Sequence, residues 1–235
     1  MVQARRRFLE VGHYRQLLER LETDVAELLG DSAGAKRDPQ HRPCVLEVGC
    51  GEGYYVGHLA RSRSCIAGPG AVFAGADVSK PAVRLAARSY PEATFFVADV
   101  NRRIYVRDAS VSVLLDVFAP RNPAEFDRIV EPGGAAVIVI PSPTHLSSLR
   151  TEFGLLGVQD DKEAKVIQRL GAGFSLVCRS ELSYPIEIQD DVMRDLVNMG
   201  PNRWHDPDLS ALSAAPITTE ASFVILQLRR HDESR

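Results

Sequence analysis

Residues 43–55 read PCVLEVGCGEGYY, an apolar run that leads into three glycines at alternate positions and then into two tyrosines. Residues 45–48 have the composition of a buried strand, and residues 54–62 follow as a helix. Gly49, Gly51 and Gly53 between them would let backbone N–H groups and a helix N-terminus approach a ligand closely. The stretch therefore predicts either a ligand-binding turn or, without a ligand, a tight strand-to-helix connection.

Strand and helix signals continue to alternate on both sides of this turn. Residues 2–29 predict two helices divided at Gly12, and residues 30–43 predict a linker. Further strands end at Asp77 and at Asp99, and others cover VSVLLDVFAP and AAVIVIP. The series predicts a parallel sheet with helices on both faces, followed by two late strands that suit a hairpin at a sheet edge. We expect a helical lid segment and linker over 1–40 and a single α/β domain over 41–235.

The composition excludes several classes of protein. The 235 residues are 45% hydrophobic and 25% charged, which suits a globular domain, and no apolar run reaches the length of a membrane span. The net charge of −3 and the scattered arginines give no overall electrostatic signature of nucleic-acid binding. The four cysteines have neither disulfide-scaffold density nor metal-ligand spacing, so we expect no metal. We expect a cytoplasmic protein, monomeric or homodimeric, with no membrane partner.

The glycine turn carries negative charge, which indicates the kind of ligand. A dinucleotide fingerprint needs a third glycine at a spacing that this turn lacks. Glu47 and Glu52 would repel a phosphate, whereas they suit a cationic ligand such as a sulfonium with its amino group. The sequence therefore favours S-adenosylmethionine over NAD.

Two more carboxylates follow later strands. Asp77, with Val78 beside it, is placed to accept hydrogen bonds from ribose hydroxyls, and Asp99, with Val100, could accept from an adenine amine. Each carboxylate alone could equally be a helix cap. Together they fall at the carboxyl ends of successive parallel strands, where such sheets bind ligands, so we predict a cofactor site there.

A family resemblance rests on several motifs. These are VLEVGCGEGYY, ADVSKPAVRLAARSYP, VADV, DVFAPRNPAEFDRIVEPGG and PSPTHLSSLR, with RRRFLEVGHY upstream and MGPNRWH downstream. The chain resembles, over nearly its whole length, the 23S rRNA guanine-N1-methyltransferases, closest to their macrolide-resistance branch in antibiotic-producing actinomycetes. The resemblance implies the class I S-adenosylmethionine-dependent methyltransferase fold, Rossmann-like with seven strands. It also implies that Tyr14, Gly51, Glu52 and His145 contact the cofactor.

The sequence departs from the family pattern in two places. Family members begin with a small zinc module of four Cys/His ligands that helps to grip RNA, and this sequence starts where that module would have ended. We expect either that the module lies on a segment not included here or that the protein no longer needs RNA. Asp116, at the end of the fourth predicted strand, stands where the resembled enzymes tend to carry Asn or Arg.

Catalysis of methyl transfer depends first on positioning and then on removal of a proton from the acceptor. Asp116 is the main candidate base, the alternative being a cap or a solvated turn residue, and His58 and His205 are weaker candidates. A planar acceptor needs aromatic faces, although such residues are more often core. The predicted acceptor contacts are Tyr54, Tyr55, Phe118, Tyr184, Arg203 and Trp204.

These departures favour a small-molecule acceptor. The leading hypothesis is methylation, at carbon or nitrogen, of an indole-type ring such as that of a tryptophan-containing cyclic dipeptide in secondary metabolism. The alternative is a 23S rRNA guanine-N1-methyltransferase whose partner is ribosomal RNA. A third reading is a protein that binds the methyl donor without catalysis.

Overall fold

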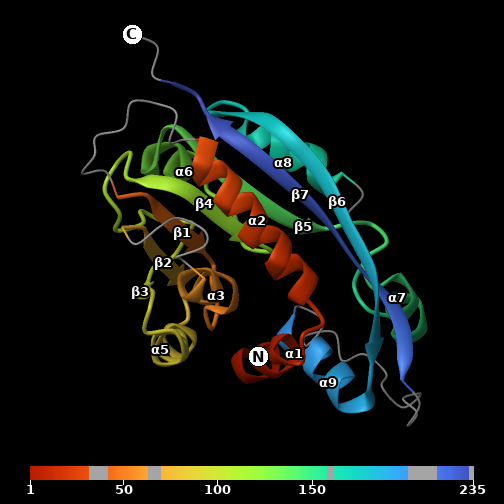
Figure 1. Ribbon diagram of the computed structural model, residues 1–235. Helices are drawn as coiled ribbons and strands as arrows, with labels where there is room; N and C mark the ends of the chain where they lie inside the picture. Colours follow the sequence, from red (N-terminus) through yellow and green to blue (C-terminus); the bar gives the residue numbers. More distant parts are fainter. Residues whose placement is uncertain (32–41, 63–69, 158–160, 201–215, 233–235) are drawn as a thin grey trace.

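The computed structural model describes residues 1–31, 42–62, 70–157, 161–200 and 216–232. Within them, seven strands form one sheet in the order β3-β2-β1-β4-β5-β7-β6 (Figure 1). The first five strands pair in parallel, and β7 is antiparallel to both of its neighbours. The strands are β1 (Cys44–Val48), β2 (Val72–Asp77), β3 (Thr94–Val97), β4 (Val111–Val117), β5 (Val130–Pro141), β6 (Phe174–Ile188) and β7 (Ile217–Arg230).

The predicted α/β fold is confirmed, with one refinement at the late edge. The two last strands form the expected antiparallel pair, but β7 is inserted between β5 and β6, so β6 is the edge strand. The helices of the described residues are α1 (Val2–Glu10), α2 (Arg15–Asp31), α3 (Tyr54–Arg61), α5 (Lys80–Ser89), α6 (Pro123–Ile129), α7 (Ser147–Phe153), α8 (Lys162–Leu170) and α9 (Asp190–Met199).

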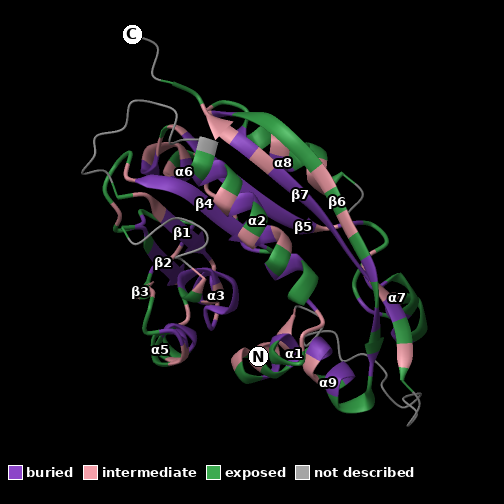
Figure 2. Ribbon diagram, in the orientation of Figure 1, coloured by how far each residue is buried: buried purple, intermediate pink, exposed green. Residues whose placement is uncertain are grey.

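Two apolar cores lie on opposite faces of the sheet. Helices α2, α3, α7 and α9 contribute to one core, and α6 and α8 contribute to the other. All seven residues of β4 are buried, which explains why this central strand is a nearly continuous apolar run (Figure 2). The alternation along β4 places Val113, Leu115 and Val117 in the first core and Leu114 in the second.

Short local signals set the helix boundaries. Gly12 has a φ of +97° and separates α1 from α2, as its position predicted. The hydroxyl of Ser79 accepts a hydrogen bond from the N–H of Ala82 at the start of α5, and Asn122 caps α6 in the same way. Among the described residues, no helix is long and apolar enough to cross a membrane.

The order of the sheet reverses between β1 and β4, which creates a crevice at the carboxyl ends of the strands. Helices α1 and α9 lie side by side at this end of the molecule (Figure 1). Arg7 of α1 forms a bidentate ion pair with Asp195 of α9, at 2.5 and 2.8 Å, which joins the two helices. The chain's first helix is thus placed over the crevice that the glycine turn borders.

Candidate active site

The glycine turn after β1 is tightly enclosed. Gly49 and Gly51 have φ angles of +66° and +59°, and a Cβ on Gly49 would lie 2.4 Å from the Cβ of Ala119. A Cβ on Gly51 would lie 2.7 Å from Nη1 of Arg5. Gly53, with a φ of +82°, begins α3 and packs against Phe95 instead of lining the crevice. The turn therefore needs glycine both for its backbone conformation and for its close neighbours.

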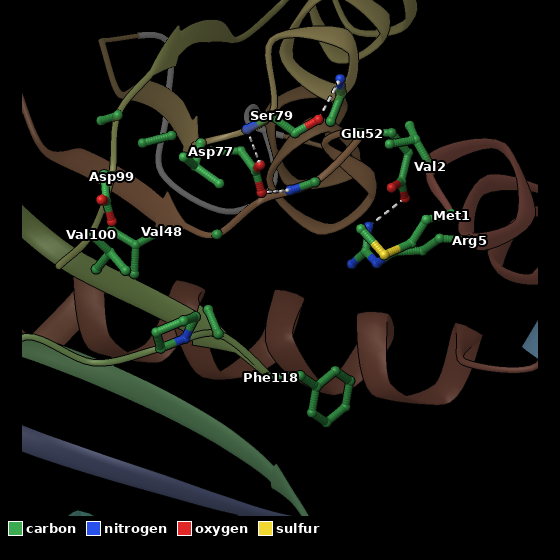
Figure 3. Close-up of a pocket in the computed structure, with 18 of the residues that line it drawn as sticks. Met1, Val2, Arg5, Val48, Glu52, Asp77, Ser79, Asp99, Val100 and Phe118 are labelled. Atoms are coloured by element: carbon green, nitrogen blue, oxygen red, sulfur yellow. Dashed lines mark hydrogen bonds and ion pairs between the residues drawn. The ribbon is translucent and has the colours of Figure 1, made fainter. Parts of the chain in front are cut away.

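Asp77 ties this turn to the end of β2. Its Oδ2 accepts a hydrogen bond from the N–H of Gly51 at 2.8 Å, and its Oδ1 accepts from the N–H of Ser79 at 2.7 Å (Figure 3). Asp99, just beyond β3, accepts from the N–H of Asn101 at 3.0 Å. The two carboxylates thus lie at neighbouring strand ends, as the sequence predicted.

A cavity of about 330 Å³ lies along these strand ends. Asp99, Val100 and Val48 lie toward one end of it and Arg5 at the other, with Asp77 between them (Figure 3). We call this space the donor cavity. Its volume is in the range of small-ligand sites, and its wall combines apolar side chains with a few carboxylates. Its complete lining is Met1, Val2, Arg5, Val48, Gly49, Gly51, Glu52, Ala76, Asp77, Val78, Ser79, Ala82, Ala98, Asp99, Val100, Asn101, Ile104, Phe118, Ala119, Pro120 and Met199.

Glu47 lies beneath the turn and does not line the donor cavity. It is fully buried, and its Oε2 accepts a hydrogen bond from the N–H of Val56 in the first turn of α3 at 2.9 Å. Burial raises the pKa of this carboxyl to about 8. The pleat of β1 turns this side chain toward α3, so its position favours a supporting role under the turn, and its predicted contact with a cofactor stays a prediction.

A second cavity of about 650 Å³ adjoins the first, and we call it the acceptor cavity. Arg5, Gly49, Phe118 and Met199 line both spaces. Phe118 follows β4 with a φ of +62°, a strained conformation for a residue with a Cβ, and its side chain is held at the junction of the two cavities. The two cavities are thus adjacent, as a donor and an acceptor of a transferred group require.

Tyr14 and His145 meet in the wall of the acceptor cavity, although 131 residues separate them. The hydroxyl of Tyr14 lies 3.1 Å from Nε2 of His145, and Nδ1 of His145 accepts a hydrogen bond from the N–H of Ser222 at 3.1 Å. Nδ1 thus carries no proton, and the neutral ring carries its proton on Nε2. Burial lowers the pKa of His145 to about 4 and raises that of Tyr14.

Asp116 lines neither cavity. It is fully buried, its Oδ1 accepts a hydrogen bond from the N–H of Ala119 at 3.0 Å, and its Oδ2 lies 3.2 Å from Nε of Arg121. The alternation along β4 points this side chain to the face opposite Val117, which does line the acceptor cavity. This arrangement favours a structural contact with Arg121, and the role of Asp116 as catalytic base stays a prediction.

The other predicted acceptor contacts lie mostly in the core. Tyr54 and Tyr55 are buried in α3, and the hydroxyl of Tyr184 donates to the carbonyl of His13 at 3.0 Å. His58 packs edge-on against Tyr54 on the outer side of α3. None of these residues lines either cavity, because helix α3 turns Tyr54 and Tyr55 toward its neighbours and Tyr184 lies in β6. Their predicted roles, including that of His58 as a base, stay predictions. Of the predicted acceptor contacts within the described residues, only Phe118 lines the cavities. The predicted contacts Arg203 and Trp204 and the candidate base His205 lie outside the described residues.

Three cationic side chains at the site were missed by the sequence reasoning. Arg5 of α1 pairs with Glu52 at 2.5 Å, while Arg150 of α7 and Lys162 of α8 line the acceptor cavity. Nε of Arg150 is buried without a hydrogen-bond partner among the residues that the structure describes. Arg5 lies in the motif RRRFLEV and Arg150 in PSPTHLSSLR. Both motifs are distant from the glycine turn in the sequence, so no sequence pattern indicates that these residues lie beside it.

Comparison with curated proteins identifies close relatives. The chain is 40% identical to the 23S rRNA (guanine(748)-N(1))-methyltransferase of Streptomyces fradiae, over 88% of this chain and 70% of that protein. It is 37% identical to a protein of Micromonospora griseorubida that is named provisionally as a 23S rRNA (guanine-N(1)-)-methyltransferase, over 97% and 79% of the two chains. No protein-family model matches the chain.

Solved structures support the fold at lower identity. A provisionally assigned methyltransferase of Bacillus halodurans superposes with a TM-score of 0.57 at 13% identity, over 89% of this chain and 99% of the other. The [4+2]-cyclase SpnF gives 0.55 at 16% identity, over 91% and 81%. Because a cyclase shares the fold, the architecture alone does not define the reaction.

The curated relatives overturn the leading hypothesis on the acceptor. The prediction of a small-molecule, indole-type methyltransferase of secondary metabolism is wrong, because the relatives at 37–40% identity over most of the chain carry the name of rRNA enzymes. The family resemblance, the fold and the methyl donor are all confirmed. The chain belongs to the 23S rRNA (guanine-N1)-methyltransferase family and is an S-adenosylmethionine-dependent methyltransferase.

Proposed function

We propose that this enzyme methylates N1 of a guanine in 23S rRNA. The observation that carries the proposal is the acceptor cavity, which adjoins the donor cavity at Phe118 and has Arg150 and Lys162 in its wall. A cavity with an aromatic side chain and cations suits a planar base that becomes electron-rich during reaction. The names of the curated relatives supply the acceptor class.

The donor cavity suits S-adenosylmethionine, which supplies an electrophilic methyl group when bound. Asp77 would accept hydrogen bonds from the ribose hydroxyls and Asp99 from the adenine amine, while Val78 and Val100 would contact the adenine ring. Gly49 and Gly51 line this cavity with backbone alone, so their N–H groups are open to close approach by a ligand.

A guanine in RNA must leave its stack to reach such a site, and enzymes that modify bases extrude them into a pocket. Phe118 is 37% exposed and lies at the junction, so its ring is available for stacking on the extruded base. Arg150 carries a permanent charge and a buried Nε without a partner among the described residues, which suits the guanine O6.

Methylation at N1 requires that the N1–H proton leaves as the new N–C bond forms and the methyl–sulfur bond breaks. His145 is a poor base for this proton, because its Nδ1 already accepts from Ser222 and burial lowers its pKa to about 4. Arg150 and Lys162 would instead stabilise the N1-deprotonated guanine, whose negative charge is shared with O6. We therefore propose electrostatic stabilisation in the acceptor cavity, with the proton released to water.

The segment after β3 offers an exposed surface for RNA beside the donor cavity. Tyr105 is 86% exposed, and Arg103 and Arg107 are exposed on either side of it. The backbone beneath is fixed, because Arg128 donates to the carbonyls of Ile104 and Val106 at 2.8 and 2.9 Å. Exposed cations beside an aromatic ring suit phosphates and unstacked bases.

The test is methylation of 23S rRNA fragments by the purified protein, read by primer extension and by mass spectrometry of the nucleosides. A methyl group on N1 blocks base pairing, so we expect a reverse-transcription stop at one guanine and N1-methylguanine in the digest. Replacement of that guanine by adenine should abolish both signals. No N1-methylguanine in any fragment or in intact 50S subunits would contradict the proposal.

Two pairs of substitutions test the RNA surface. Arg103→Ala/Arg107→Ala should weaken RNA binding and flatten its dependence on salt, by about 0.7–0.9 in log–log slope for each lost phosphate contact. Lys165→Ala/Arg169→Ala on α8, which packs against β6 at the opposite sheet edge, is the matched control and should leave both unchanged. Equal effects of the two pairs would place the RNA elsewhere.

A further inference from the structure

A buried ion pair closes one end of the donor cavity. Nη1 of Arg5 and Oε1 of Glu52 lie 2.5 Å apart, and the two side chains are 20% and 4% exposed (Figure 3). Arg5 comes from α1, and Glu52 lies between the second and third glycines of the turn after β1. The pair therefore joins the first helix of the chain to the ligand-binding turn.

One oxygen of the Glu52 carboxylate lacks a partner in the described part of the chain. Its Oε2 is buried and accepts no hydrogen bond from any residue that the structure describes. An unsatisfied buried carboxylate oxygen is costly, so its place at the cavity wall favours a ligand that brings an N–H group. Arg5 has five N–H donors, and the interaction with Glu52 engages Nη1.

The neighbouring charges do not satisfy this pair. Asp77 is engaged by the N–H groups of Gly51 and Ser79. Glu47 lies beneath the turn, and its ionised form is disfavoured by burial, which raises its pKa to about 8. A cationic group and an anionic group therefore face the same end of the cavity, each with hydrogen-bonding capacity left.

The direction of the bound methyl donor follows from the other end of the cavity. Asp99 and Val100 suit the adenosine part, and they lie opposite Arg5 (Figure 3). The amino-acid part would then extend toward the ion pair and the junction with the acceptor cavity. That part carries an α-ammonium and an α-carboxylate, whose charges are complementary to those of Glu52 and Arg5.

We propose that Arg5 binds the α-carboxylate of S-adenosylmethionine and that Glu52 accepts hydrogen bonds from its α-ammonium. Helix α1 would thereby supply a donor-binding residue in addition to its position over the crevice. The assignment concerns the methyl donor alone and does not depend on the identity of the acceptor. Its test can therefore fail while rRNA methylation stands, and the reverse also holds.

The experiment measures binding by calorimetry without RNA, for three ligands. They are S-adenosylhomocysteine, its decarboxylated analogue, which keeps the amine, and its deaminated analogue, which keeps the carboxylate. Arg5→Met should weaken S-adenosylhomocysteine and the deaminated analogue about 10- to 100-fold, the range of a charge-assisted hydrogen bond. It should leave the decarboxylated analogue within about threefold of the wild-type value.

Glu52→Gln should give the reciprocal pattern, with selective loss for the two ligands that keep the amine. Arg6→Met is the matched control, because Arg6 is the next residue on α1 and pairs with Glu10 at 2.6 Å, away from the donor cavity. It should bind all three ligands like the wild type.

A loss in Arg5→Met that is equal for all three ligands would overturn the proposal, because it would assign the pair a purely structural role. No loss for any ligand would overturn it as well. If Arg5→Met does not fold, as judged by its thermal transition, Arg5→Lys takes its place. That variant keeps the charge but not the planar fork, so it should lose affinity less than Arg5→Met while keeping the same preference among ligands.

Discussion

Substitution of Glu47 by glutamine should change how the stability of the enzyme depends on pH. Glu47 is fully buried, Oε2 accepts from the N–H of Val56, and Oε1 has no hydrogen-bond partner among the described residues. Burial is the largest influence on its pKa and raises it from 4.5 to about 8, against the lowering effect of Arg5. The folded protein thus favours the protonated carboxyl, which resembles glutamine in shape and charge.

The pKa difference of Glu47 between the folded and unfolded states makes the stability of the protein depend on pH. Because the pKa is higher in the folded state, the contribution of Glu47 to stability is fully present below about pH 4.5 and is lost as the pH rises through about 8. The difference between about 8 and 4.5, at about 1.4 kcal/mol per pH unit, corresponds to an upper value of about 5 kcal/mol. Glu47→Gln removes this titration. The free energy of unfolding of the variant, relative to that of the wild type, should therefore rise by several kcal/mol between pH 5 and pH 9.

Urea unfolding of both proteins at pH 5, 6, 7, 8 and 9, without ligand, measures this difference. Glu10→Gln, at an exposed glutamate of α1, is the control and should follow the wild-type curve. If the free-energy difference between Glu47→Gln and the wild type stays constant over this range, Glu47 is ionised in the folded state. In that case the proposed supporting role of a neutral carboxyl would be refuted.

Three further predictions concern the site. Gly49→Ala should weaken S-adenosylhomocysteine binding at least tenfold in calorimetry. Gly49 has a φ of +66°, and the new Cβ would lie 2.4 Å from the Cβ of Ala119. The control Gly30→Ala, where a Cβ meets nothing within 4 Å, should have no effect. Asp77→Asn should cost about 1–3 kcal/mol of donor affinity in calorimetry, because Asp77 holds the backbone N–H groups of Gly51 and Ser79 in the wall of the donor cavity; unchanged affinity would argue against this placement. Tyr14→Phe should lower the free energy of unfolding by about 1 kcal/mol in urea titrations, because the Nε2–H of His145 loses its partner; unchanged stability would mean that this contact adds nothing to the fold.

The sequence was sufficient for the features that depend on near neighbours in the chain. The apolar run before Gly49 predicted β1, and the period of the following segments predicted the strands that end near Asp77 and Asp99. The resemblance identified the family, and the acidic glycine turn predicted a sulfonium donor. The prediction of the acceptor was wrong because it gave weight to single departures such as Asp116. The relatives that indicate rRNA match the chain over most of its length.

The tertiary structure decided what depends on contacts between distant residues. It placed Arg5 against Glu52, 47 residues away, and Tyr14 against His145, 131 residues away. It also separated the predicted tyrosines of α3 from the cavities. Periodicity shows that a side chain is buried or exposed, but the partner across the crevice depends on how the helices pack over the sheet. For that reason the sequence alone determined the fold and the donor, and the folded chain decided which charged groups border the two cavities.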